Sequence, residues 1–87
     1  MTRTAALECA RGNVTANVIF FGMVDPAGSR ATVPQQHWDV IVRRNALQRV
    51  ASIGEVADIV AFYASEKSAF ITGAEVAVDG GQTLLVL

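Results

Sequence analysis

The sequence carries little charge of either sign. Its 87 residues include 7 Lys plus Arg and 8 Asp plus Glu, which gives a net charge of −1. Proteins that bind nucleic acid or an anionic membrane present a basic patch, and the nearest thing to one here is the pair Arg43–Arg44. Two adjacent arginines on a predicted helix are expected on a solvated face. We therefore predict no nucleic-acid partner and no membrane partner.

Cysteine and long hydrophobic runs are also scarce. Cys9 is the single cysteine, so no internal disulfide can form, which fits a reducing compartment. The longest uncharged stretch, Gly12 to Val24, is shorter than the ~20 residues that a membrane-spanning helix needs. Arg3 could open a signal peptide, but Glu8 interrupts the apolar stretch that should follow. We expect a cytoplasmic protein.

Apolar side chains, in contrast, are abundant at 52% of the sequence, above the roughly 45–50% of a globular domain. The length allows one domain, so residues 1–87 are treated as a single unit. A small domain buries a smaller fraction of its surface than a large one and needs more polar residues. The apolar excess therefore indicates that part of this surface contacts something else. The composition also excludes intrinsic disorder.

The first half of the chain predicts a helix, a strand and a loop. Helix-forming residues fill Met1 to Ala10, and Gly12 follows as a helix stop. The segment Asn13 to Phe21 has apolar residues at both parities, the pattern of a strand buried on both faces in a parallel sheet. Gly22 ends this strand, and Val24 to Ala31 is predicted to be a loop.

The second half predicts two helices and a final strand. Thr32 with Gln35, and Ser52 with Glu55, both have capping-box spacing. Trp38, Ile41, Val42 and Asn45 then fall on one face of the first helix, and Val56, Ile59, Val60 and Tyr63 form an apolar stripe on the second. The last strand spans Ala74–Val78. The order helix-strand-helix-helix-strand predicts an α/β fold with two parallel strands, and two strands form an incomplete sheet.

The run Arg49–Thr83 resembles the C-terminal segment of the short-chain dehydrogenases/reductases. The match rests on Phe70–Gly73 followed by Val78–Gly81, and it is similar to 3-oxoacyl-ACP-reductase-like members of that family. Upstream, Thr2–Glu8 is similar to the second half of the helix that follows the active-site tyrosine and lysine. Val14–Ile19 is similar to the sixth strand. The resemblance implies the C-terminal fragment of a Rossmann-like, doubly wound parallel sheet.

The resemblance also implies that the catalytic centre lies outside these 87 residues. The family binds the cofactor pyrophosphate at a glycine-rich strand–helix turn near the N-terminus, and no glycine pair here has that spacing and context. The strand with the catalytic serine and the start of the tyrosine–lysine helix are missing too. We expect a truncated fragment with no catalytic residue and no cofactor of its own. NAD(P)-dependent carbonyl or alcohol oxidoreduction is expected only if a missing N-terminal half completes the fold.

One pattern imitates the family's active site. Tyr63 and Lys67 have the Tyr-x-x-x-Lys spacing, in which the family uses tyrosine as general acid/base and lysine to lower its pKa. In the family, however, that pair precedes the sixth strand, whereas Tyr63 follows it. Tyr63 also belongs to the apolar stripe of its helix, so we interpret it as a packing residue.

Three residues are candidates for contact with a cofactor. Gly22, Met23 and Val24 occupy the place where the family has a Pro-Gly loop against the nicotinamide. Phe21 replaces the proline, and Pro26 stands where a threonine is common. The alternative for Gly22 is an ordinary glycine at the end of a strand.

The remaining conspicuous side chains are interpreted as structural. His37 lies where the family has its variable substrate lid, and a lone histidine cannot form a zinc site, so no metal is predicted. Thr72 is expected to bond local backbone at a turn. Gly73 is expected to supply a positive φ, and Gly80 and Gly81 to let the chain turn tightly after the last strand.

The orphan strand edge and the tail Leu84–Leu87 predict self-association. An unpaired apolar edge is a template for another strand, so we expect a homo-oligomer. A complementing N-terminal chain of the same family is a further expected partner. Three interpretations stay open at this point: an inactive truncated reductase, a non-enzymatic self-assembling module, or one portion of a complete enzyme.

Overall fold

A computed structural model describes residues 1–25 and 34–85. The helices and strands, in chain order, are α1 (Thr2–Cys9), β1 (Val18–Phe21), β2 (Val24–Asp25), α3 (Gln35–Val42), β3 (Ala51–Ser52), α4 (Ile53–Ala64) and β4 (Glu75–Val78). Three short 3-10 turns, η1 (Ala10–Gly12), η2 (Glu66–Ser68) and η3 (Gln82–Leu84), lie between or after them. None of the helices in these two ranges has the length and hydrophobicity needed to cross a bilayer.

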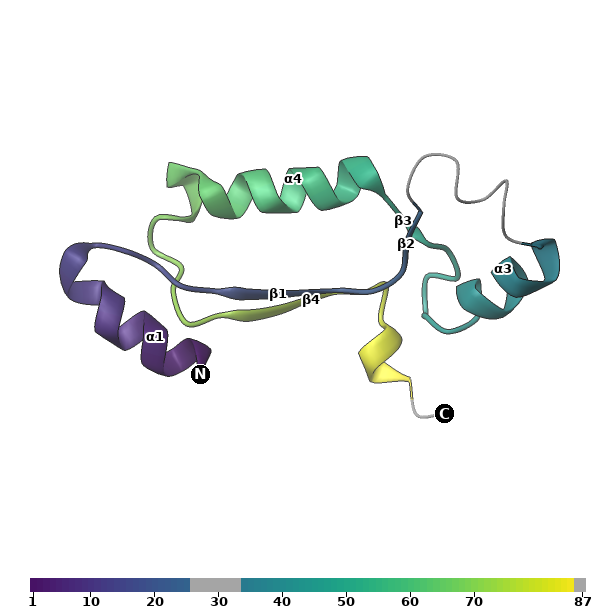
Figure 1. Cartoon of the computed structure of the whole chain (residues 1–87), viewed down its shortest axis with the longest axis horizontal. Coiled ribbons are helices and arrows are strands. Elements are labelled where there is room, and N and C mark those ends of the chain that lie inside the picture. Colours follow the sequence, from purple (N-terminus) through teal and green to yellow (C-terminus); the bar gives the residue numbers. More distant parts are fainter. Residues whose placement is uncertain (26–33, 86–87) are drawn as a thin grey trace.

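The strands form two parallel pairs, as the strand–helix–strand order predicted. β1 pairs with β4 in a register that sets Val18 opposite Glu75 and Phe21 opposite Val78, and β2 pairs with β3. α4 lies along one face of the β1–β4 pair, and α1 and α3 lie at opposite ends of the molecule (Figure 1). The predicted α/β class is confirmed.

The first strand is shorter than predicted because side chains hold the preceding segment. It begins at Val18 instead of Asn13, and Val14 is exposed. The Asn17 side chain donates from Nδ2 to the Ile71 carbonyl (3.1 Å) and accepts from the Ala74 amide at Oδ1 (2.9 Å). These side-chain bonds, with the backbone bond from the Gly73 amide to the Ala16 carbonyl (2.8 Å), hold the segment before β1 without a regular strand ladder.

Thr72 and the helix stop also differ from the sequence prediction. The Thr72 hydroxyl accepts from the Ala16 amide (3.1 Å), 56 positions away, so the predicted local turn bond is wrong. After α1 and its 3-10 extension, Asn13 and not Gly12 takes the left-handed conformation, with φ 58°. Asparagine tolerates this conformation because its side chain is short and polar. The predicted positive φ of Gly73 is confirmed at 73°.

Part of the predicted loop after Gly22 is a strand. Val24 and Asp25 form β2 beside Ala51 and Ser52, and the Ala51 amide donates to the Met23 carbonyl (3.0 Å). The loop prediction was wrong for these two residues because their partner lies far along the chain. The rest of that predicted loop lies outside the described residues.

The two predicted helix starts have different outcomes. At α4, Ser52 Oγ accepts from the Glu55 amide (3.1 Å) and Glu55 Oε1 accepts from the Ser52 amide (3.0 Å), so the capping box is confirmed. Thr32, the predicted cap of the earlier helix, lies outside the described residues. α3 begins at Gln35, and Pro34 is its N-cap residue without a side-chain cap.

The chain has no closed hydrophobic core in its described part. Only Ala6 and Trp38 among the described hydrophobic side chains are buried, with 4% and 3% of their surface exposed. In β1, Ile19 and Phe21 are half-buried, whereas Phe20 is 54% exposed. The predicted burial of β1 on both faces is therefore wrong for this chain, because α4 covers only one face.

Candidate functional site

A hollow of about 220 Å³ lies at the carboxyl ends of the parallel strands. Met23 follows β1 and Asp79 follows β4, and both line it. The other polar and charged lining side chains come from the segment after α3 and from the first turn of α4: Asn45, Arg49 and Glu55. Ligands of open α/β sheets bind outside the carboxyl ends of the strands, so this hollow is the candidate site.

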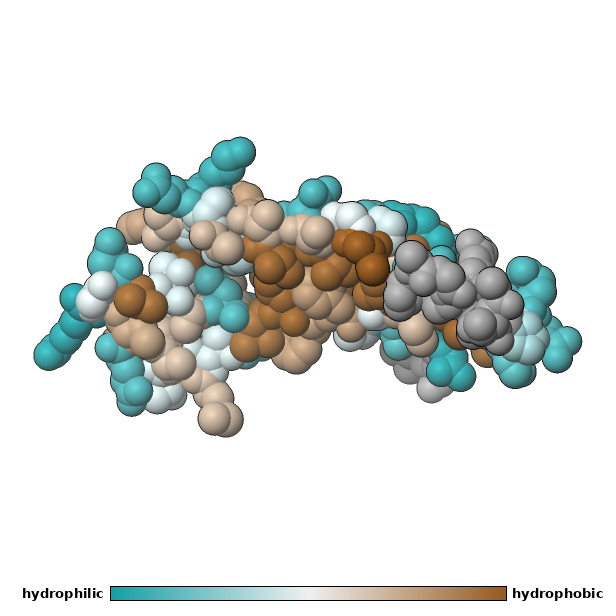
Figure 2. All heavy atoms as spheres, turned by 45° about the horizontal axis from the view of Figure 1, so that its top comes forward, coloured by the Kyte–Doolittle hydropathy of each residue, from teal (hydrophilic) through white to brown (hydrophobic). Residues whose placement is uncertain are grey.

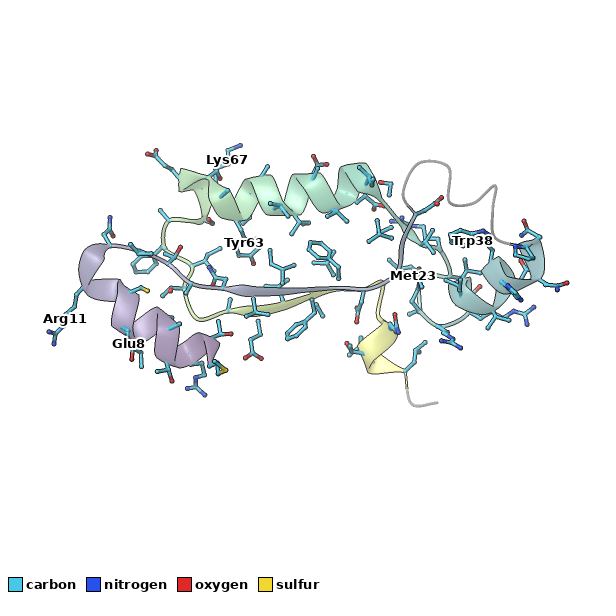
Figure 3. The ribbon with its side chains drawn as sticks, in the orientation of Figure 1. Glu8, Arg11, Met23, Trp38, Tyr63 and Lys67 are labelled. Atoms are coloured by element: carbon cyan, nitrogen blue, oxygen red, sulfur yellow. The ribbon has the colours of Figure 1, made fainter. Side chains whose placement is uncertain are left out.

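The three candidate cofactor residues have different surroundings. Met23 lies where the chain leaves β1 (Figure 3), is 48% exposed and lines the hollow. Val24 is engaged in β2. Gly22 donates its amide to the Val78 carbonyl (3.0 Å), and a Cβ at Gly22 would lie 3.0 Å from Asp79 Cα. This close approach gives Gly22 a structural reason to be glycine; contact of the three with a cofactor stays a prediction.

Two of the three charged side chains at the hollow, Arg49 and Glu55, neutralise each other. Arg49 donates to both carboxylate oxygens of Glu55 at 2.7 Å, which is the bidentate geometry of a strong pair. The hydrogen bond from Arg49, with that from the Ser52 backbone, lowers the pKa of the Glu55 carboxyl from 4.5 to about 2. Hydrogen bonding to Glu55 raises the pKa of the Arg49 guanidinium. The pair ties Arg49, which precedes β3, to Glu55 in the first turn of α4, and the two charges cancel.

Asn45 holds the segment between α3 and β3. It is buried, with 6% of its surface exposed, and its Nδ2 donates to the Arg49 carbonyl (2.7 Å). The Arg49 amide donates back to Asn45 Oδ1 (3.4 Å), and the Leu47 amide donates to the Gly80 carbonyl (3.1 Å). The sequence pattern placed Asn45 only on the same helix face as Trp38, Ile41 and Val42. The signal for its role was present, since an asparagine among buried apolar positions needs hydrogen-bond partners.

Asp79 organises the turn after β4. Its carboxylate accepts from the amides of Gly81 and Thr83, each at 3.0 Å. The bond from the Thr83 backbone is the largest cause that lowers the pKa of the Asp79 carboxyl. The predicted tight turn is confirmed, with φ of 62° at Gly80 and 90° at Gly81. The hydrogen-bonded polar groups of the hollow therefore stabilise the fold, and none of them forms a nucleophile–base pair.

Tyr63 and Lys67 do not form a catalytic pair. α4 ends at Ala64, and Lys67 lies in the following 3-10 turn. Tyr63 points from α4 toward the strands, and Lys67 points away from them (Figure 3). The Tyr63 ring is half-buried and meets Phe62 edge-on, with the centroids 5.3 Å apart. The structural interpretation of Tyr63 therefore fits its surroundings.

The part of the chain that the structure describes holds no cluster of three or more His, Cys, Asp or Glu side chains placed to bind a metal ion. His37 is exposed on α3.

Comparison with known proteins assigns the family. A family profile described as enoyl-(acyl carrier protein) reductase matches residues 1–83. The solved structure of a short chain dehydrogenase family protein from Francisella tularensis superposes on 98% of this chain with a TM-score of 0.84 and 27% identity, covering 39% of that protein. The chain belongs to the short-chain dehydrogenase/reductase family. The resemblance inferred from its motifs and the Rossmann-like fold are thereby confirmed.

Other members of the short-chain dehydrogenase/reductase family match at higher identity. The 3-oxoacyl-[acyl-carrier-protein] reductase MabA of Mycobacterium tuberculosis is 41% identical over 86 residues, which cover 93% of this chain and 32% of the relative. The human (3R)-3-hydroxyacyl-CoA dehydrogenase is 37% identical over 81 residues, 93% of this chain and 31% of the relative. The structure of the promiscuous reductase LugOII matches with a TM-score of 0.85 and 32% identity, over 97% of this chain and 33% of that one. The chain thus spans about a third of the length of its relatives.

The Glu55 pair gives a pH-dependent prediction. Because the folded-state pKa is lowered, the stabilisation by ionised Glu55 is complete above pH 4.5 and is lost as the pH falls to about 2. A carboxyl ¹³C NMR titration is expected to show Glu55 titrating near the lower limit. The control variant Arg49→Ala is expected to move this midpoint back toward 4.5. A native midpoint at the ordinary value would contradict the bidentate pair.

Proposed function

We propose that this chain forms the C-terminal part of an NAD(P)-dependent reductase of 3-oxoacyl thioesters and has no such activity alone. Two relatives carry names that specify 3-oxoacyl-[acyl-carrier-protein] reduction and 3-hydroxyacyl-CoA dehydrogenation. Both names describe a thioester with a reacting oxygen at carbon three, which supports this substrate class. A cytoplasmic location belongs to the same proposal; the single cysteine, Cys9, forms no disulfide within the chain, which fits a reducing compartment.

The observation that carries the proposal is that the polar side chains lining the hollow are already hydrogen-bonded within the chain. Asn45, Glu55 and Asp79 all bond to backbone or to Arg49, so they shape the site instead of reacting in it. An acid–base group, and a glycine-rich turn for the pyrophosphate, would have to come from elsewhere. The chain's contribution would be the wall at the carboxyl ends of β1 and β4.

The Gly22–Val24 segment suits the nicotinamide end of a dinucleotide. Met23 is exposed beside the hollow, and the backbone of Gly22 is fixed by its bond to Val78. In the completed enzyme these residues would border the nicotinamide, which supplies hydride to the substrate carbonyl. They would keep that ring against the substrate and exclude water on one side.

A complementation assay tests this proposal. NADPH oxidation with acetoacetyl-CoA is measured for this chain alone and for its mixture with the separately produced N-terminal two thirds of the M. tuberculosis relative. We expect no rate above background for the chain alone and turnover in the mixture. Met23→Asp is expected to lower the rate of the mixture at least tenfold. Leu7→Asp, at an exposed position on α1, is the matched control. Turnover by the chain alone would overturn the proposal.

The second candidate function is a non-enzymatic self-assembling module. The extended shape favours it, because the radius of gyration is 16.0 Å, against about 12 Å for a compact chain of this length. Such a shape leaves much apolar surface for contact with another chain.

A further inference from the structure

Residues 45–52, here called the strap, connect the carboxyl ends of β1 and β4. The strap follows α3 and includes β3. Near its start, the Leu47 amide donates to the carbonyl of Gly80, which follows β4 (3.1 Å). Near its end, the Ala51 amide donates to the carbonyl of Met23, which follows β1 (3.0 Å). The strap therefore runs along the hollow from one strand end to the other, and Met23 is tied to it.

Hydrophobic packing contributes little to the position of the strap. Asn45 is its buried residue, with 6% of its surface exposed, and the other strap residues are exposed or half-buried. Figure 2 shows the hydrophobic side chains gathered across the middle of the molecule, whereas the strap lies toward the α3 end (Figure 1). The position of the strap therefore depends on its hydrogen bonds and on the contacts of Asn45.

The strap begins with a tight turn that the Asn45 side chain braces. The Gln48 amide donates to the Asn45 carbonyl (3.2 Å), and Gln48 takes a left-handed conformation with φ 55°. This conformation is unfavourable for most residues other than glycine, so the turn needs bonds that hold it. Asn45 Nδ2 donates to the Arg49 carbonyl (2.7 Å), and Oδ1 accepts from the Arg49 amide (3.4 Å). One side chain thus holds both backbone polar groups of the residue after the turn.

We propose that Asn45 is a positioning residue that, through the strap, keeps Met23 in place at the hollow. Its side chain fixes the course of the chain at Arg49, two residues before the Ala51 amide that bonds to Met23. Asn45 Oδ1 would also lie 3.0 Å from a Cβ at Gly80, so Asn45 packs directly against the turn after β4. Asn45 therefore fixes the strap at the end of β4, and the strap fixes Met23 at the end of β1.

The catalytic consequence rests on the proposed function, because Met23 is one of the residues proposed to border the nicotinamide. A displaced Met23 would weaken binding of the nicotinamide end, so the KM for NADPH is expected to rise more than kcat falls. If the native chain never complements an N-terminal chain, the proposed function fails. The two measurements on this chain alone then decide the role of Asn45.

Hydrogen exchange on this chain alone gives the first test. Asn45→Asp is isosteric and keeps the acceptor for the Arg49 amide, but it places a carboxylate oxygen instead of a donor against the Arg49 carbonyl. The Leu47 and Ala51 amides are expected to exchange at least about tenfold faster in this variant, because the strap has lost its brace. The Gly73 amide, which is hydrogen-bonded before β4 at the other end of the sheet, is expected to keep its native rate. Equal acceleration at all three amides would mean that Asn45 only stabilises the fold, and would overturn the proposal.

The methyl signals of the two methionines give the second test. Met23 lines the hollow, as Figure 3 shows, and Met1 lies at the α1 end of the molecule (Figure 1), so one spectrum contains both the site and a reference. Asn45→Asp is expected to shift and broaden the Met23 signal and to leave the Met1 signal unchanged. Gln48→Asn is the matched control, because it alters the same turn at an exposed side chain and asparagine tolerates the left-handed conformation. It is expected to change neither signal, and a native Met23 signal in Asn45→Asp would overturn the proposal.

Kinetics of the complementing mixture give the third test. Asn45→Asp is expected to raise the KM for NADPH at least about tenfold while kcat changes less than about threefold. Gln48→Asn is expected to keep both constants within about twofold of their native values. A residue that only stabilised the fold would reduce the amount of assembled enzyme, so a fall in kcat with an unchanged KM would overturn the proposal. If Asn45→Asp fails to fold, Asn45→Ser removes the same bonds without burying a charge, and the same changes are expected from it.

Discussion

Trp38→Ala is expected to lower the free energy of unfolding by about 3–5 kcal/mol, the cost of truncating a large buried side chain. Trp38 is one of two buried hydrophobic residues in the described chain and exposes only 3% of its surface. A small domain has a total stability of about 5–10 kcal/mol or less, so this loss removes a large part of it. Urea unfolding followed by far-UV circular dichroism measures it, at one chain concentration because self-association shifts the midpoint.

Two controls separate burial from hydrophobicity in this experiment. Trp38→Phe retains most of the apolar volume and is expected to cost less than half as much. Phe70→Ala removes an aromatic side chain that is fully exposed, and its effect is expected to stay within about 0.5 kcal/mol. If Trp38→Ala and Phe70→Ala moved the urea midpoint equally, the Trp38 side chain would not be buried as the structure describes.

The features that the sequence predicted well are those with local signals. The start of α4 was predictable because Ser52 and Glu55 satisfy each other's backbone within one turn. The turn at Gly80 and Gly81 was also predictable from a local signal, because glycine readily adopts a left-handed conformation that other residues rarely adopt. The parallel pairing of β1 with β4 followed from the order of the elements.

The features that the sequence missed depend on partners far along the chain. β2 exists because Val24 meets Ala51, and β1 begins late because Asn17 bonds to residues 71–74. A local window contains only one side of each of these interactions. The candidate site shows the same division: Gly22 could be singled out by its position after a strand, but its contact with Asp79 Cα needs three dimensions. That no second layer covers β1 in the described part of the chain could not be foreseen either, because the hydrophobicity of a strand depends on everything that packs against it in the complete protein.

Gly81→Ala is expected to destabilise the chain by about 2–6 kcal/mol, because two separate costs coincide there. Gly81 has φ 90° and ψ 11°, a conformation that costs a non-glycine residue about 1–3 kcal/mol. Its new Cβ would also lie 2.9 Å from Ala46 Cβ, and overpacking of this kind typically costs about 1–3 kcal/mol. Gly54→Ala is the matched control, since a Cβ there meets only Ser52 Oγ at 3.8 Å inside α4. It is expected to stabilise the chain by about 0.5–1 kcal/mol.

The double variant Ala46→Gly/Gly81→Ala divides the two costs. Removal of the Ala46 methyl group relieves the contact but not the backbone strain. Gly81→Ala is therefore expected to cost about half as much stability in the Ala46→Gly background as it does in the native chain. A coupling energy near zero in this cycle would mean that the turn after β4 does not pack against Ala46. The attachment of the α3–β3 segment to the carboxyl end of β4, which closes one side of the hollow, would then rest on the bond from the Leu47 amide to the Gly80 carbonyl and on the close approach of Asn45 to Gly80. Loss of that attachment in the Gly81→Ala chain is therefore expected to lower the complementation rate as well as the urea midpoint, and Gly54→Ala is expected to lower neither.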